Sequence, residues 1–153
     1  MKTRKALSRI LLRVSFTLLL LNGLALAAVG KPQADDAAIK KYDTVAYFEA
    51  GQALKGDDSF TLLWHDKMWY FSTEENRDLF ANNPEKYAPQ YDGYCAWAMT
   101  EKRKAETDPA VWKIVNGKLY LNCSREAYGK WSRDIPGNIK KADKIWLEIL
   151  GGK

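Results

Sequence analysis

The residues with the most distinctive chemistry in this chain are its two cysteines, Cys95 and Cys123, and its single histidine, His65. Thiolate sulfur and imidazole nitrogen are preferred ligands of copper and zinc in proteins. We therefore expect a metal ion of the copper or zinc class to be bound. Cys95 is the best candidate ligand, and His65 and Cys123 are the next candidates. The two cysteines form no Cys-x-x-Cys pair, so their spacing does not by itself define a site.

Other interpretations of the cysteines stay open at this level. Cys95 lies in an apolar segment, Gly93-Tyr-Cys-Ala-Trp97, and could be a small buried core residue. Cys95 and Cys123 could instead form one disulfide, because an exported chain meets oxidising conditions. A third function, thiol-redox chemistry, would require one of the two thiols to be accessible. His65, in a polar turn, could equally be a solvated turn residue.

The familiar catalytic patterns are missing from the sequence. It has no Gly-rich phosphate loop, no Gly-x-Ser-x-Gly elbow and no His-Glu-x-x-His zinc motif. With one histidine, a Cys–His nucleophile pair could be built only with His65, and no second base or orienting residue is evident. We therefore expect a non-catalytic binding protein.

Aromatic residues are abundant, with 6 Trp, 8 Tyr and 5 Phe. Most should build the core. Because Trp and Tyr are also enriched where a domain contacts a ligand, the alternative function is a small-molecule or protein-partner binding module, lined by aromatic side chains and without a metal.

The N-terminus has the pattern of a secretory signal peptide. Five basic residues precede an apolar run over 14–28, and Ala25-Leu-Ala27 supplies the small residues for cleavage before Ala28. The run is interrupted by Asn22-Gly23 and is shorter than the roughly 20 residues of a membrane span. We expect a periplasmic or secreted protein with no stable membrane anchor after cleavage.

The basicity of the chain belongs to this signal. The formal net charge is +5, with 24 Lys and Arg against 19 Asp and Glu, and the signal carries five basic residues and no acidic one. The mature part is therefore neutral, which argues against nucleic acid as a partner. Its length suits one domain. We divide the chain into a signal peptide (1–27), a flexible tether (28–40) and one domain (41–151).

Hydrophobic patterns predict a small α+β domain with two β-hairpins, three helices and no internal repeat. The first hairpin has strands near 59–64 and 68–71, and the second turns at Asn116-Gly117, a strong type I′ signal. Ser72 should cap a helix from Thr73 to about residue 83, and Ser124 a second helix. The third carries an apolar stripe at helical spacing, made of Ile139, Ala142, Ile145, Trp146 and Ile149.

The segment from Trp64 to Tyr87, with its Trp69-Tyr-Phe71 triplet and its Asn-Pro-Glu-Lys-Tyr87 exit, resembles the YHS domain, a small hairpin-and-helix module related to TRASH-like metal-binding domains. The longer pattern from Tyr42 to the final helix is similar to stand-alone exported bacterial YHS proteins. The resemblance implies a small α+β fold and the handling of metals.

The metal ligands of those relatives are not present here. Metal-binding members of the wider group carry cysteines after the aromatic pair and on the helix, and this chain has Ser72 and Asn76 at those positions. Hydroxyl and amide oxygens are weak ligands for a soft metal. His65 matches the position of the family's namesake histidine. Any metal ligands in this protein must therefore differ from those of its relatives.

Overall fold

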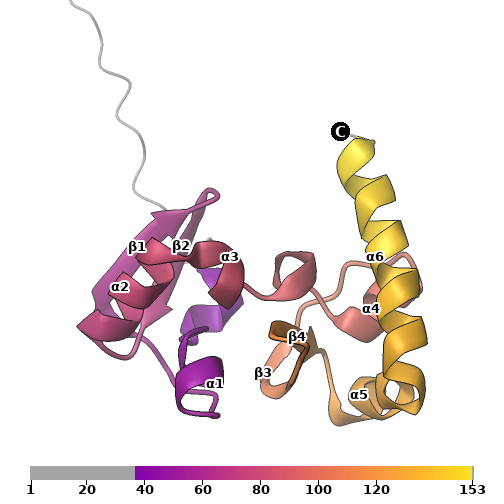
Figure 1. Ribbon diagram of the computed structural model, residues 1–153, viewed down its shortest axis with the longest axis horizontal. Coiled ribbons are helices and arrows are strands. Elements are labelled where there is room, and N and C mark those ends of the chain that lie inside the picture. The colour runs from indigo at the N-terminus through magenta and orange to yellow at the C-terminus, as the bar shows by residue number, and fades with distance from the viewer. Residues whose placement is uncertain (1–36, 153) are drawn as a thin grey trace, which may run out of the picture. The chain divides into compact units, whose positions relative to one another are not determined.

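A computed structural model describes residues 37–152 (Figure 1). The expected signal peptide and residues 28–36 of the expected tether lie outside the described residues. Within the described part, no helix has the length and apolar character needed to cross a membrane.

The fold class is confirmed as α+β, with two separate antiparallel hairpins. Strands β1 (Asp57–Trp64) and β2 (Lys67–Phe71) form the first hairpin, and β3 (Asp108–Val115) and β4 (Lys118–Asn122) form the second. Both turns place their two central residues at positive φ: His65 and Asp66 in the first, Asn116 and Gly117 in the second. The Asn-Gly turn predicted from sequence is therefore present, and the first hairpin adopts the same backbone without a glycine.

The three predicted helices are present, and three short helices are added to them. The predicted ones are α2 (Glu74–Asn82), α5 (Arg125–Trp131) and α6 (Ile135–Gly151). The short ones are α1 (Ala46–Glu49), α3 (Pro84–Tyr87) and α4 (Ala96–Thr100), together with the 3₁₀ turns η2 (Ala38–Lys41), η3 (Gln90–Gly93) and η4 (Ser132–Asp134). These pieces are too short for an apolar period to reveal them.

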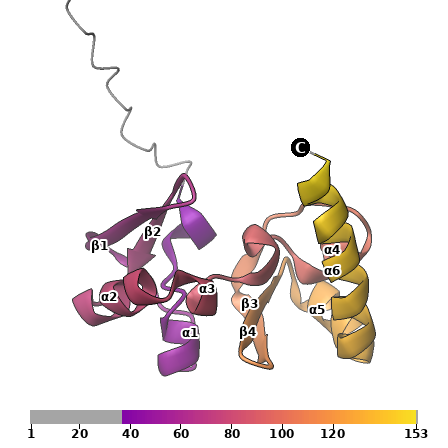
Figure 2. The same ribbon diagram turned by 45° about the horizontal axis from the view of Figure 1, so that its top comes forward.

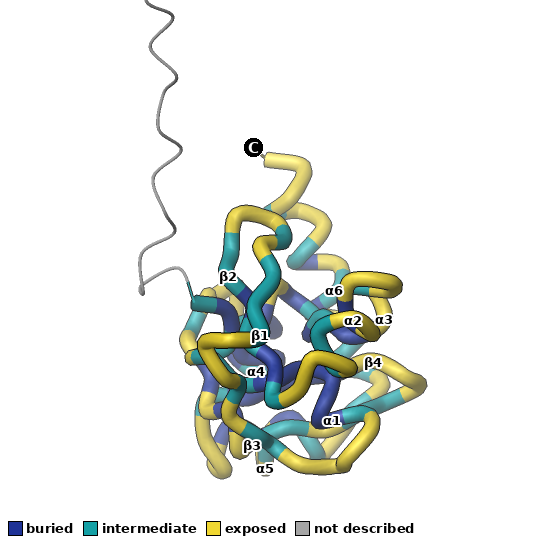
Figure 3. The backbone as a smooth tube through the Cα atoms, turned by 90° about the vertical axis from the view of Figure 1, so that its left-hand side faces the viewer, coloured by how far each residue is buried: buried dark blue, intermediate teal, exposed yellow. Residues whose placement is uncertain are grey.

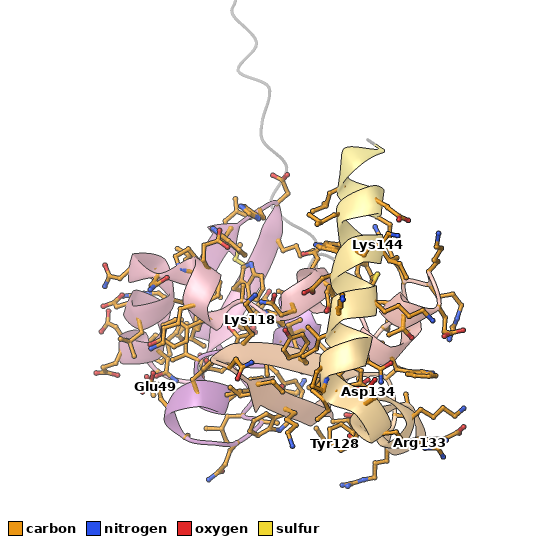
Figure 4. The ribbon with its side chains drawn as sticks, turned by 45° about the vertical axis from the view of Figure 1, so that its right-hand side comes forward. Glu49, Lys118, Tyr128, Arg133, Asp134 and Lys144 are labelled. Carbon is orange, nitrogen blue, oxygen red and sulfur yellow. The ribbon has the colours of Figure 1, made fainter. Side chains whose placement is uncertain are left out.

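Side-chain caps fix where the helices start. Ser124 Oγ accepts the Ala127 N–H at 3.1 Å, as predicted. At α2 the prediction was one residue early: Thr73, not Ser72, is the cap and accepts from the Asn76 N–H at 3.1 Å. Asp134 caps α6 through the Gly137 N–H at 3.0 Å, and Figure 4 shows Asp134 at the start of that helix.

The chain contains an internal structural repeat, which corrects the expectation of none. The first half (38–82) runs through η2, α1, β1, β2 and α2, and the second half (90–131) through η3, α4, β3, β4 and α5. In both hairpins the register shifts at the same place, between Asp57 and Thr61 and between Asp108 and Trp112. Sequence identity between the halves is low, so the repeat is a property of backbone and packing.

The predicted tether also ends earlier than expected. Ala37 forms a parallel bridge with Met68, and Ala38 is buried within the core cluster of the first half. Residues 38–41 form η2, which corresponds to η3 in the second half. They belong to the domain because the buried β2 strand needs a backbone partner and an apolar cover on this side.

Each half has its own aromatic core, and Tyr47 is one of the residues that link them. Phe80 of α2 packs on Trp69 and Phe71 in the first core, and Trp131 of α5 packs on Tyr120 in the second. Tyr47 of α1 packs with Leu119 and Leu121 of β4 and donates a hydrogen bond to the Pro109 carbonyl at 2.8 Å. Figure 3 shows buried backbone, in dark blue, at α1 and α4.

Helix α6 covers the second half. Its apolar stripe is the predicted one, with Ala142 and Ile145 buried and Ile139, Trp146 and Ile149 packed against the same cluster. Helix α4 lies beside it (Figure 2). The first half has no counterpart to α6.

We predict that Phe80→Ala lowers the free energy of unfolding by about 3–5 kcal/mol, because it empties a fully buried aromatic site. Leu79, its neighbour on the same helix, is 40% exposed, and Leu79→Ala should cost less than about 1 kcal/mol. Urea titrations of both variants test this. Equal losses would contradict the assignment of the core face of α2.

Candidate functional site

The structure brings Cys95 and Cys123 together and does not add His65 to them. The Cys123 backbone N–H donates to Cys95 Sγ at 3.1 Å. Within residues 37–152, no group of three or more His, Cys, Asp or Glu side chains is placed to hold a metal ion. The three-residue ligand set expected from the sequence therefore reduces to the cysteine pair, Cys95 and Cys123.

Secondary structure explains why the two cysteines meet. Cys95 is the N-cap residue of α4, and its Sγ also accepts the Ala98 N–H at 3.5 Å. Cys123 follows β4 and precedes Ser124, the cap of α5. Each cysteine therefore stands at the start of a helix, and the packing of α4 against β4 sets one against the other.

The two cysteines differ in how far solvent reaches them. Cys95 is fully buried, and Cys123 is partly exposed. Burial raises the pKa of the Cys95 thiol, and the opposing hydrogen bond from the Ala98 N–H does not cancel this effect. At neutral pH Cys95 therefore carries its proton. Its S–H group donates a hydrogen bond to Asn122 Oδ1, which lies 3.8 Å from the sulfur.

Asn122 is an unusual neighbour for the pair. It is fully buried at the end of β4, and its Oδ1 accepts the Trp97 N–H at 3.2 Å, which fixes the amide orientation. Its Nδ2 has no hydrogen-bond partner among the described residues. A buried amide donor without a partner is costly, and Thr44, Trp131 and Ser132 each have a buried polar atom in the same condition among the described residues.

The internal repeat supplies a comparison for the pair. Asp43 occupies in the first half the position of Cys95, and Ser72 that of Cys123. Asp43 is fully buried; its Oδ1 accepts the N–H groups of Val45 and Ala46 at 2.9 and 3.2 Å, and its Oδ2 accepts the Ser72 N–H at 2.8 Å. Ser72 Oγ and Asn76 Nδ2 complete the shell at 2.6 and 2.7 Å. We call this arrangement the Asp43 clasp.

The Asp43 clasp gives Ser72 and Asn76 a structural role. Ser72 and Asn76 both donate to the Asp43 carboxylate, so their role is to satisfy a buried charge. The sequence-based reasoning missed Asp43 altogether. The repeated pattern of Tyr42 with Tyr94 and of Asp57 with Asp108 is the signal that could have revealed the repeat and drawn attention to it.

His65 belongs to a different feature. It is exposed at the tip of the first hairpin, and its ring stacks on Trp64 with centroids 3.8 Å apart. Both side chains line a cleft of about 630 Å³ that we call the aromatic cleft; its other aromatic walls are Trp69, Tyr91 and Trp146. The Trp- and Tyr-lined pocket that the sequence offered as an alternative thus has a physical counterpart.

Some of the charged side chains that line the aromatic cleft already form ion pairs or hydrogen bonds. Asp92 pairs with Lys67 at 2.8 Å, and Asp143 accepts the Tyr91 hydroxyl at 2.8 Å. Burial and the Asp143 carboxylate raise the pKa of Tyr91, so the hydroxyl remains a donor. Lys104 and Lys118 also line the cleft, and neither has a carboxylate partner among residues 37–152. Figure 4 labels Lys118 on β4.

Comparison with known proteins adds no relative: no protein-family model, no curated protein and no solved structure matches this chain.

We predict that Asp43→Ala lowers the free energy of unfolding by about 3 kcal/mol or more, because it leaves several buried donors without an acceptor. Asp58 is the matched control: it is exposed and pairs only with Lys41, so Asp58→Ala should cost about 0–1 kcal/mol. Chemical denaturation measures both. A loss at Asp43 no larger than at Asp58 would show that the clasp is not structural.

Proposed function

We propose that this protein is an exported, non-catalytic YHS-type binding domain whose cysteine pair holds a soft metal ion, with Cu(I) as the best fit. The observation that supports the proposal is the proximity of Cys95 and Cys123. The Cys123 backbone N–H donates a hydrogen bond to Cys95 Sγ at 3.1 Å. Two residues distant in sequence supply two soft sulfur ligands at one place.

The ligand number favours Cu(I) over Zn(II). Zinc sites in proteins use three or four protein ligands, and the described residues supply two at this place. Cu(I) is bound well by two thiolates. Partial exposure of Cys123 gives the ion a route in, and the N–H groups of Ala98 and Cys123 point at Cys95 Sγ, where they would stabilise the thiolate that binding requires.

We predict that the reduced protein binds one Cu(I) in competition with a chromophoric Cu(I) chelator. Cys95→Ser and Cys123→Ser should each weaken binding by more than the roughly 10- to 100-fold that loss of an outer hydrogen-bond partner costs. His65→Gln is the control and should leave the affinity unchanged, because His65 lies outside the pair. No retained copper in the reduced wild type, or equal loss in His65→Gln, would overturn the proposal.

The aromatic cleft supports a second candidate function, the binding of a small molecule. Walls of Trp64, Trp69 and Trp146 suit a planar apolar body. Lys104 and Lys118 line the cleft without an ion-pair partner among the described residues, and Lys104 Nζ lies 5.5 Å from the centroid of the Trp146 ring. Glu85 and Asp143 place negative charge in the same lining. Together these features favour a planar ligand with an anionic group.

We predict that 8-anilinonaphthalene-1-sulfonate, an anion with a planar naphthalene ring, binds the folded protein with a rise in dye fluorescence. Lys104→Gln combined with Lys118→Gln should weaken binding about tenfold, equivalent to about 1.4 kcal/mol. The control, Lys113→Gln combined with Lys130→Gln, removes two exposed lysines outside the cleft and should have no effect.

Glu85 provides the opposite test of that prediction. It also lines the cleft, so Glu85→Gln should leave binding of the anionic dye unchanged or stronger. Weaker binding by Glu85→Gln, or tighter binding of a cationic dye of similar size, would contradict the assignment of an anionic ligand. Near-ultraviolet circular dichroism of each variant separates these results from a loss of packing.

A further inference from the structure

The Asp43 clasp and the cysteine pair perform the same structural task in the two halves. Asp43 accepts the N–H three residues ahead, from Ala46, and Cys95 does the same from Ala98. Each also accepts the backbone N–H of the residue that follows the second strand of its hairpin, Ser72 or Cys123. The fold therefore requires an acceptor here that ties the start of a short helix to the exit of a hairpin.

The Asp43 carboxylate and the Cys95 sulfur differ in strength as hydrogen-bond acceptors. The Asp43 carboxylate takes five donors at 2.6–3.2 Å. Cys95 Sγ takes two N–H donors at 3.1 and 3.5 Å, and sulfur is a weak acceptor. Ser72 Oγ donates to Asp43, whereas the group at its place in the second half is a second thiol. In the reduced protein, the hydrogen bonds that hold α4 to the hairpin exit in the second half are therefore the weaker ones. A disulfide between Cys95 and Cys123 would link the same two places covalently.

We infer that Cys95 and Cys123 close to a disulfide that replaces the hydrogen bonds of the Asp43 clasp in the second half, and that this bond switches off the metal site. The second part of this inference rests on the proposed function, because the same two sulfur atoms are the proposed metal ligands. The first part stands on the internal repeat alone.

The chemistry is a thiol–disulfide exchange with a disulfide-bearing oxidant. Cys123 is the partly exposed thiol, so its thiolate attacks the oxidant, forms a mixed disulfide and releases the oxidant's first thiol. Cys95 then loses its proton and attacks Cys123 Sγ, which expels the second thiol. The protein loses two protons and two electrons in all, and the oxidant's disulfide becomes two thiols.

The experiment compares the full chain after treatment with oxidised glutathione and after reduction with dithiothreitol. Oxidised protein should show no free thiol after denaturation, and reduced protein should show two. The bond closes a loop of about 30 residues, so the oxidised form should melt roughly 10 °C higher. Two thiols after oxidation, or the same melting temperature in both states, would overturn the inference.

A triple variant rebuilds the Asp43 clasp in the second half. Cys95→Asp with Cys123→Ser, to which Ala127→Asn adds the counterpart of Asn76, should fold and melt at a temperature that does not depend on reductant. Cys95→Ala with Cys123→Ala is the control. It lacks both sulfur atoms, so it can form neither the hydrogen bonds to Cys95 Sγ nor a disulfide, and it should melt below the reduced wild type. Should the rebuilt variant not fold, the wild-type comparison decides by itself.

Cu(I) competition on the same samples separates the two proposals. Binding by reduced protein and loss of binding after oxidation support both. Binding in both states, with two thiols present after oxidation, leaves the metal site standing and removes the disulfide. A disulfide in protein that never binds Cu(I) when reduced removes the metal function and leaves the covalent tie.

Discussion

The fold depends on a tie between the start of a short helix and the exit of a β-hairpin, and this tie is made twice. Each short helix is about one turn long, too short to be stable by its own hydrogen bonds. A buried acceptor at Asp43 or Cys95 satisfies the first N–H groups of the helix and, through Ser72 or Cys123, holds it against the hairpin. The helices α1 and α4 can therefore be buried, with Tyr47 and Met99 in the cores.

The two ties solve the same problem with different chemistry. A buried carboxylate is tolerated only when its oxygens are satisfied, and Asp43 meets that condition through Ser72 and Asn76. In the second half the acceptor is the Cys95 sulfur, which takes two N–H donors. Each half also has a buried polar atom without a partner among the described residues, Thr44 Oγ1 in the first and Asn122 Nδ2 in the second.

The aromatic residues divide between the two cores and the aromatic cleft. Phe80 and Trp131 are fully buried at corresponding places in the two halves and serve the cores. Trp64 and Trp146 come from the hairpin tip and α6, elements distant in sequence, and meet across the aromatic cleft. Leu147 and Leu150 of α6, a helix that follows only the second half, also line the cleft.

Local sequence determined much of this protein. The Asn116-Gly117 turn, the Ser124 cap and the apolar stripe of α6 are each specified by residues close together in the chain, whose conformational preferences act without distant partners. The predicted export signal is likewise a local pattern, and it lies outside the described residues. The prediction was wrong at Ser72, because a distant carboxylate takes this side chain away from the helix end.

Only the tertiary structure decided which chemical groups meet. Cys95 and Cys123 come together because α4 packs on β4, whereas His65 remains at a hairpin tip with Trp64. The repeat was hidden for the same reason: its halves share backbone geometry and buried contacts while most side chains differ. A sequence lists the groups that could react and the local turns that carry them. Which of them become neighbours is decided by the burial of apolar surface between elements far apart in the chain, and no local preference encodes that choice.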